Sequence, residues 1–186
     1  MIRAFRFFAL VSFLLLGAGA ARAADLENTL YLDVPAGRVV IQLRPDLAPM
    51  TVAHIKDLTR RGFYDGLTFH RVIDGFMAQT GDPKGNGSGG SGKTVKAEFS
   101  QAHFQRGTVG LARAEDPNSG DSQFFICFKE APFLDGKYTI FGQVTQGMEF
   151  VDAIKKGDPN RNGSVVNPDH IVRMQVAADA EKAKKP

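Results

Sequence analysis

The sequence contains no tryptophan and only one cysteine, Cys127, in 186 residues. A single cysteine cannot form an intramolecular disulfide, so stability must come from the packing of apolar side chains, which include fifteen phenylalanines. Cys127 lies in the apolar run SQFFICF, where a free cysteine typically behaves as a small buried hydrophobe. The sequence therefore favours neither a disulfide-stabilised fold nor a cysteine nucleophile.

The motifs of metal sites and of nucleophilic enzymes are also missing. The four histidines lie far apart, and the sequence has neither an HExxH motif nor a CxxC pair. Ser122 occurs in GDSQF rather than in the GxSxG motif of the hydrolases. We therefore expect no metal and no cofactor, and a reaction that needs no covalent step.

One segment matches a nucleotide-binding pattern. The sequence GSGGSGKT at residues 87–94 fits the phosphate-loop motif GxxxxGK[ST]. That motif requires a buried strand before it and a helix after it, so that backbone amides meet the phosphates. Here DPKGN precedes the segment, and TVKAEF, which alternates like a strand, follows. The context predicts a glycine-rich surface loop.

Residues 1–23 have the pattern of a signal peptide. Arg3 and Arg6 precede an apolar run over residues 7–16, and Ala21-Arg22-Ala23 supplies small residues for cleavage near Ala23. The apolar run is shorter than the roughly 20 residues of a membrane-spanning helix, so we expect no stable membrane insertion after cleavage. Without this segment the chain has 23 − 3 = 20 basic and 20 acidic residues. A balanced charge without a basic stripe gives no indication of nucleic-acid binding.

The remaining chain predicts one mainly β domain. Two strands at 29–34 and 38–43 flank a turn at Pro35-Ala36-Gly37, and helical spacing of apolar residues predicts helices at 49–61 and 148–156. Further strands are predicted at 68–73, 76–80, 108–112, 122–128, 138–144 and 170–176. Many short strands favour a closed or nearly closed antiparallel barrel. Residues 179–186 are polar and are predicted to be a disordered tail.

Three longer segments carry a family resemblance. FHRVIDGFMAQTGD begins at residue 69, and GLARAEDPNSGDSQFFICF and APFLDGKYTIFGQV follow it in order. These segments resemble the motifs of the cyclophilins, and the resemblance covers residues 28 to 177. It implies a peptidyl-prolyl cis-trans isomerase domain over residues 24–178. The implied fold is a closed eight-stranded antiparallel β-barrel capped by two α-helices.

The resemblance also implies a site. Arg71 would be the catalytic residue, bonding the twisted amide of an X-Pro peptide, and His70 is expected to be a packed neighbour rather than a base. A proline pocket would be formed by Phe76, Met77, Phe125, Phe133, Leu134 and Tyr138. The substrate main chain would be held by Gln79, Gln123, Ala112 and Arg113. Phe133 replaces a tryptophan of better-known relatives, and losing the indole N–H predicts weaker binding of cyclosporin-type inhibitors.

Two other functions stay open at this point. A non-catalytic module that holds proline-containing segments as a chaperone would use the same groove, and a generic exported barrel that binds a small ligand would need the motifs to be coincidental. The expected partners are proline-containing peptides and unfolded exported proteins. Nothing in the sequence indicates more than a monomer. Among the secretory destinations, a bacterial periplasm is preferred over an endoplasmic reticulum or the medium.

Overall fold

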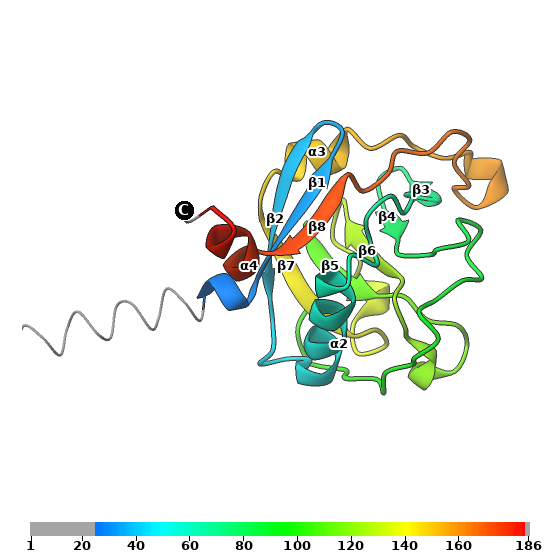
Figure 1. The fold of residues 1–186 in the computed structure, drawn as a ribbon. Helices are drawn as coiled ribbons and strands as arrows, with labels where there is room; N and C mark the ends of the chain where they lie inside the picture. Colours follow the sequence, from blue (N-terminus) through cyan, green and yellow to red (C-terminus); the bar gives the residue numbers. More distant parts are fainter. Residues whose placement is uncertain (1–24, 185–186) are drawn as a thin grey trace, which may run out of the picture.

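The computed structural model describes residues 25–184, and the predicted signal peptide at 1–23 lies outside that range. Eight strands form one sheet in the order β3-β4-β6-β5-β7-β2-β1-β8, and every neighbouring pair is antiparallel (Figure 1). The strands are β1 (Thr29–Val34), β2 (Gly37–Leu43), β3 (Arg71–Ile73), β4 (Met77–Thr80), β5 (Thr108–Leu111), β6 (Phe124–Cys127), β7 (Ile140–Gln146) and β8 (Arg173–Val176). All eight predicted strands are confirmed, some of them shorter than predicted.

The sheet curls, but its two edges do not form a continuous ladder. β3 and β8 are the outer strands of the sheet. The segments just before them are joined by an isolated bridge between Thr68 and His170 and by a hydrogen bond from the Phe69 N–H to the Asp169 carbonyl at 2.9 Å. The prediction of a closed barrel is therefore not confirmed. The structure supports an eight-stranded, curled half-barrel.

The main core fills the concave side of the sheet and includes two helices. The α-helix α2 (Pro49–Arg60) packs on β8 and β7, and α3 (Met148–Asp152) packs on β2. Val52, Ile55 and Leu58 of α2 recur on one helical face and join the same buried cluster as the inward-facing strand residues. Both predicted helices are confirmed, although α3 ends four residues earlier than expected.

A further helix corrects the prediction for the C-terminal segment. Residues 177–182 form α4 (Ala177–Lys182), which packs on β1 and β8. Ala177, Ala178 and Ala180 are buried there, and Arg60 of α2 donates a hydrogen bond from Nε to Asp179 Oδ2 at 2.8 Å. The predicted disordered tail is therefore wrong for residues 179–182, because small alanines and one carboxylate suffice to attach the helix.

Within residues 25–184, no helix is both long and apolar enough to cross a membrane. The same part of the chain has no cluster of His, Cys, Asp or Glu side chains that could hold a metal ion.

Candidate active site

A second, smaller apolar cluster lies on the opposite face of the central strands. Phe124 and Ile126 of β6 point into the main core, whereas Phe125 and Cys127 point to the other face. Successive strand residues alternate between faces, so the continuous apolar run in β6 indicates that both faces are covered. The outer cluster is formed by Met77, Phe104, Phe125, Cys127, Ala131, Leu134 and Ile140.

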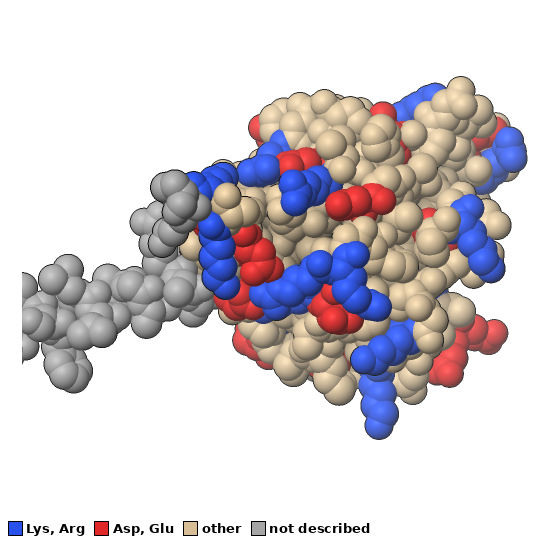
Figure 2. All heavy atoms as spheres, in the orientation of Figure 1, with Lys and Arg blue, Asp and Glu red and all other residues tan. Residues whose placement is uncertain are grey.

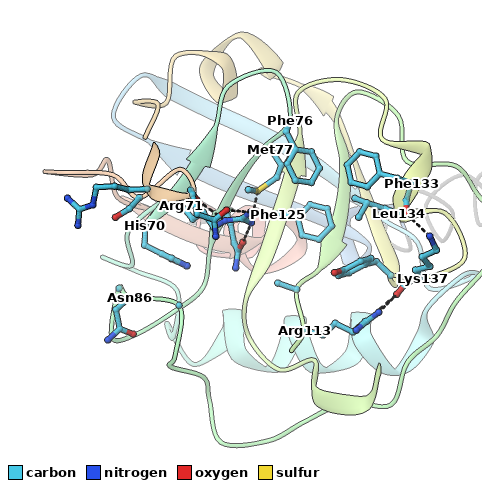
Figure 3. Close-up of a pocket in the computed structure, with 18 residues that line it drawn as sticks. His70, Arg71, Phe76, Met77, Asn86, Arg113, Phe125, Phe133, Leu134 and Lys137 are labelled. Atoms are coloured by element: carbon cyan, nitrogen blue, oxygen red, sulfur yellow. Dashed lines mark hydrogen bonds between the residues drawn. The ribbon is translucent and has the colours of Figure 1, made fainter. Parts of the chain in front are cut away.

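Met77, Phe125 and Leu134 of this outer cluster form the floor of a pocket of about 760 Å³. Phe125 lies at its centre, stacked on Phe104 with ring centroids 5.7 Å apart and meeting the edge of Tyr138 at 6.0 Å. Phe76 and Phe133 lie 5.3 Å apart along one wall (Figure 3). Met77 and Leu134 are buried beneath the surface, whereas Phe133 is 58% exposed. These side chains form an apolar surface within the pocket that is open to solvent.

Phe76 and Met77 are adjacent in the sequence, and adjacent residues of an extended strand would point to opposite faces. Both side chains line the pocket. Phe76 belongs to the turn before β4 rather than to the strand, and its N–H bonds the Ile73 carbonyl at 3.0 Å. The alternation of an extended strand therefore does not apply to this pair.

Arg71, the first residue of β3, lies beside the apolar floor and is held by three hydrogen bonds. Its Nη1 donates to Gln79 Oε1 at 3.0 Å, its Nε to the carbonyl oxygen of Asn162 at 3.1 Å, and its Nη2 to Asn162 Oδ1 at 3.0 Å. Nη1 also lies 4.0 Å from the Met77 sulfur. Burial lowers the pKa of Arg71, although a guanidinium stays charged at any physiological pH. The site therefore presents a fixed cation next to an apolar surface.

The glutamine pair extends this network to the glycine-rich loop. Gln79 donates from Nε2 to Gln123 Oε1 at 2.9 Å. Gln123 in turn donates to the carbonyl oxygens of Gly87 at 3.0 Å and Gly89 at 2.8 Å. Arg71, Gln79 and Gln123 are thus fixed relative to one another and to the loop that borders the pocket.

The rejected phosphate-loop match lies in this loop. Residues 85–94 are followed by no helix, and Asp82 accepts hydrogen bonds from the backbone N–H groups of Lys84, Asn86 and Gly87. Burial raises the pKa of Asp82, but these three donors outweigh it and lower the pKa overall. Within the motif, the N–H groups of Gly87 and Gly92 already donate to carboxylates, and no helix follows to bind a phosphate, so the rejection of the motif is confirmed.

Ala112 and Arg113 follow β5 and form the side of the pocket near Tyr138. The Arg113 guanidinium lies over the Tyr138 ring, 4.6 Å from its centroid, and donates from Nη2 to the Lys137 carbonyl at 3.0 Å. The backbone N–H and C=O of Arg113 make no hydrogen bond within residues 25–184. They are therefore free to pair with an extended peptide.

His70 is buried beside Arg71, and neither ring nitrogen has a hydrogen-bond partner in residues 25–184. Burial lowers the pKa of His70, although the nearby Asp82 carboxylate opposes that shift. The imidazole is therefore neutral at pH 7, as expected of a packed neighbour.

The structure brings the predicted site residues together, and their roles toward a substrate stay predictions. Ten of the eleven line the pocket, and Gln123 lines an adjoining one while bonding Gln79. The sequence analysis missed several lining residues, including Asn86, Lys137, Arg161, Asn162 and Ser164. The Asn162-Gly163 pair signals a turn, because both residues adopt positive φ, but nothing in the sequence indicates its contact with Arg71.

Comparison with known proteins gives consistent matches. Residues 29–176 match the family described as cyclophilin type peptidyl-prolyl cis-trans isomerase/CLD. A probable peptidyl-prolyl cis-trans isomerase of Brucella suis is 52% identical, covering 93% of this chain and 96% of the relative. Peptidyl-prolyl cis-trans isomerase B of Bacillus subtilis is 45% identical, covering 72% of this chain and 94% of the relative.

Solved structures agree with these matches. One is a cyclophilin type peptidyl-prolyl cis-trans isomerase of Cryptosporidium parvum, crystallised in the presence of the dipeptide Ala-Pro. It has a TM-score of 0.74 at 28% identity, and the match covers 80% of this chain and 98% of the Cryptosporidium parvum chain. A cyclophilin of Hirschia baltica has the same TM-score at 27% identity, and the match covers 83% of this chain and 76% of the Hirschia baltica chain. These matches, together with the curled sheet and the pocket beside Arg71, show that this chain belongs to the cyclophilin-type peptidyl-prolyl cis-trans isomerase family.

Proposed function

We propose that the chain isomerises X-Pro peptide bonds by seating the proline ring on the Phe125 floor while Arg71 donates hydrogen bonds to the rotating amide. The observation that carries this proposal is the fixed Arg71 guanidinium at the edge of an apolar pocket that is open to solvent. The crystallised Cryptosporidium parvum relative was studied with Ala-Pro, which supports a proline peptide as the ligand class.

Isomerisation of an X-Pro bond needs only this arrangement of an apolar pocket and a hydrogen-bond donor, because no covalent bond is broken. The peptide C–N bond has partial double-bond character, and its rotation barrier of about 18 to 20 kcal/mol makes uncatalysed X-Pro isomerisation slow. In the twisted amide, resonance is lost and the proline nitrogen becomes able to accept a hydrogen bond. A donor that bonds this nitrogen, or the neighbouring carbonyl, more strongly in the twisted state than in the planar state lowers the barrier.

Arg71 retains donors for this step. A guanidinium has five N–H groups, and hydrogen bonds to Asn162 and Gln79 use three of them. Besides Gln79, Nη1 has one partner in residues 25–184, the Met77 sulfur at 4.0 Å, which is a weak acceptor and lines the pocket. Donors of Arg71 are therefore available at the apolar floor, and no group in the site has to be deprotonated for turnover.

The test must separate catalysis from mere binding, because the chaperone alternative would use the same groove. Purified residues 24–186 at one hundredth of the peptide concentration should accelerate the cis-to-trans relaxation of a short X-Pro peptide without changing the equilibrium ratio. A binding module at that ratio would leave the relaxation rate at its uncatalysed value. No acceleration would therefore contradict the proposed isomerase function.

We further propose that the clients are exported proteins with slowly isomerising prolines. Support comes from the signal-peptide pattern of residues 1–23, and a bacterial periplasm is the compartment we favour. Cell fractionation followed by N-terminal sequencing should find a chain in the periplasmic fraction that begins near residue 24. A chain retained in the cytoplasm with residues 1–23 attached would contradict this role.

A further inference from the structure

The charged side chains that line the pocket are all cationic. They are Arg71, Arg113, Lys137 and Arg161, and no Asp or Glu of residues 25–184 lines the pocket. His70 also lines it but is neutral at pH 7, because burial lowers its pKa. The groove therefore carries only positive charge, which the binding of an apolar proline ring does not require.

These cations are not neutralised by neighbouring carboxylates. The hydrogen bonds of Arg71 and Arg113 go to neutral carbonyl and amide oxygens, and Lys137 Nζ donates to the Phe133 carbonyl at 3.2 Å. None of the four side chains, Arg161 included, lies within 4.0 Å of a carboxylate of residues 25–184. Their charges remain available to a ligand.

Other parts of the surface are different. Arg38 pairs with Asp33 at 2.6 Å, and Arg60 bridges Glu27 and Asp179. The face that carries α2 and α4 shows Lys and Arg side by side with Asp and Glu (Figure 2). Residues 24–186 also hold 20 basic and 20 acidic residues, so the cationic groove is a local feature of a balanced chain.

The cations lie on both sides of the apolar floor. Arg71 lies at one side, and Arg161 directly precedes the Asn162 that holds it. Arg113 and Lys137 lie at the other side, beyond Phe125 and Leu134 (Figure 3). A peptide whose proline occupies the floor would therefore place its neighbouring residues next to cationic side chains in either chain direction.

We propose, on the basis of the isomerase function proposed above, that this groove prefers proline segments with Asp or Glu within two residues of the proline. A carboxylate there meets the opposite charge of the groove cations, whereas a lysine meets like charge. Lys137 and Arg161 are exposed, so the preference is expected to be modest and to weaken as salt screens it.

The experiment compares three sets of short X-Pro peptides that carry Glu, Ala or Lys at each of the two positions on either side of proline. We expect kcat/KM to be highest for the Glu peptides, intermediate for Ala and lowest for Lys. At the position with the largest effect, the ratio of the Glu value to the Lys value (the Glu-to-Lys span) should be at least about threefold at low salt. In 1 M NaCl the span should shrink toward one. Equal values for the three peptides at all positions would overturn the preference while leaving the isomerase function intact. Absence of acceleration with the Ala peptide would instead refute the isomerase function itself.

Charge-neutral variants locate the origin of the preference. Lys137→Gln and Arg161→Gln together should reduce the Glu-to-Lys span by at least half. Arg173→Gln is the matched control, because Arg173 is exposed on β8 and lines a separate pocket near Asp65. A span that is unchanged in the double variant, or that falls as much in Arg173→Gln, would overturn the assignment of the preference to the groove.

Discussion

At the residue scale, the position of Arg71 depends on a partner that lies 91 residues further along the chain. Asn162 accepts two hydrogen bonds from the guanidinium, one at its backbone oxygen and one at Oδ1. Its φ of 53° is one that Asn and Gly adopt readily and most other residues do not. Asn162 is therefore suited to be a positioning residue that holds Arg71 at the edge of the pocket.

Asn162→Gly tests this role, because glycine keeps the backbone conformation and the carbonyl acceptor while removing Oδ1. We expect kcat to fall about threefold to tenfold, since one hydrogen bond to a charged group is lost, with little change in peptide affinity. The measurement is kcat and Kd on one X-Pro peptide, with the melting temperature recorded alongside.

Two variants control for a purely structural effect. Asn167→Gly changes the other asparagine with positive φ, which is not among the residues of 25–184 that line the pocket, and should leave kcat unchanged. Asn162→Asp keeps an acceptor oxygen and should restore most of the lost rate. If Asn162→Gly and Asn167→Gly lowered kcat equally, Asn162 would not be a positioning residue.

At the residue scale, the site residues that could be predicted from the sequence are those inside the long motifs. Arg71, Met77 and Phe125 could be assigned because the motifs surround them, and the structure brings them together. Lys137 lies inside the third motif but was not assigned to the site, because a lysine beside a glycine is usually solvated. Asn162 lies outside the motifs, in a turn, and was not assigned for the same reason. Their roles follow only from contacts made across the folded chain.

At the scale of elements, β5 and β6 serve both the core and the pocket. Val109 and Leu111 of β5 point into the main core, and Gly110 between them lies under the outer cluster. A Cβ built on Gly110 would lie 2.5 Å from Phe125 Cζ and 2.7 Å from Phe104 Cε1. The aromatic floor therefore depends on the absence of a side chain at this position of the strand.

Gly110→Ala should displace the Phe125 ring and raise KM for an X-Pro peptide. The overpacking should also lower the free energy of unfolding by about 1–3 kcal/mol. Val109→Ala is the matched control: it removes volume from the main core, so it should destabilise the fold while leaving KM within about twofold. Equal KM values for wild type and Gly110→Ala would show that Phe125 is not held in place by this close contact.

The helix α4 was missed because its sequence is short and polar. Its attachment depends on buried alanines and on a charge network in which Glu27 accepts from both Lys56 and Arg60 at 2.7 Å, while Arg60 also bonds Asp179. Hydrogen bonds from Lys56 and then from Arg60 lower the pKa of Glu27 from 4.5 to about 2. Sequence patterns do not show such a network, because its members come from three separated segments.

The lowered pKa of Glu27 predicts a pH dependence. Its stabilising contribution should be complete above pH 4.5, the ordinary value, and should be lost as the pH falls toward 2. Glu27→Gln should therefore lower the melting temperature by about 1–3 °C at pH 7, and the difference from wild type should shrink as the pH falls from 4.5 toward 2.

The control for this prediction is Glu149→Gln, which removes the same charge from an exposed residue of α3 that has no ion pair in residues 25–184. Its melting temperature should match wild type at pH 7. A difference between wild type and Glu27→Gln that stayed constant from pH 7 to pH 2 would contradict the assigned network.

At the scale of the whole molecule, strand identity was predictable but closure of the sheet was not. Runs rich in Val, Ile and Phe between turn residues identified all eight strands. Whether β3 pairs with β8 depends on the curvature accumulated over the whole sheet, which no local pattern encodes. The structure shows only a short link between residues 67–69 and 169–171.

The site is likewise a property of the whole molecule. Its lining comes from four separated segments at 70–87, 112–125, 133–138 and 161–164, and only the fold brings them around one pocket. The central claim is that this pocket binds the proline peptide while Arg71 acts on the twisted amide. Binding and turnover should therefore be separable by one substitution.

The most direct test is to measure kcat and peptide affinity separately in Arg71→Ala and Arg71→Lys, using exchange NMR on one X-Pro peptide. Loss of the hydrogen bonds from a charged donor should lower kcat about tenfold to a hundredfold, with Kd changed by less than about threefold. Arg71→Lys should recover little, because an ammonium lacks the planar fork. Arg106→Ala, which breaks an ion pair with Asp152 away from the pocket, should behave like wild type. Full turnover in Arg71→Ala, or a loss of affinity as large as the loss of kcat, would contradict the account.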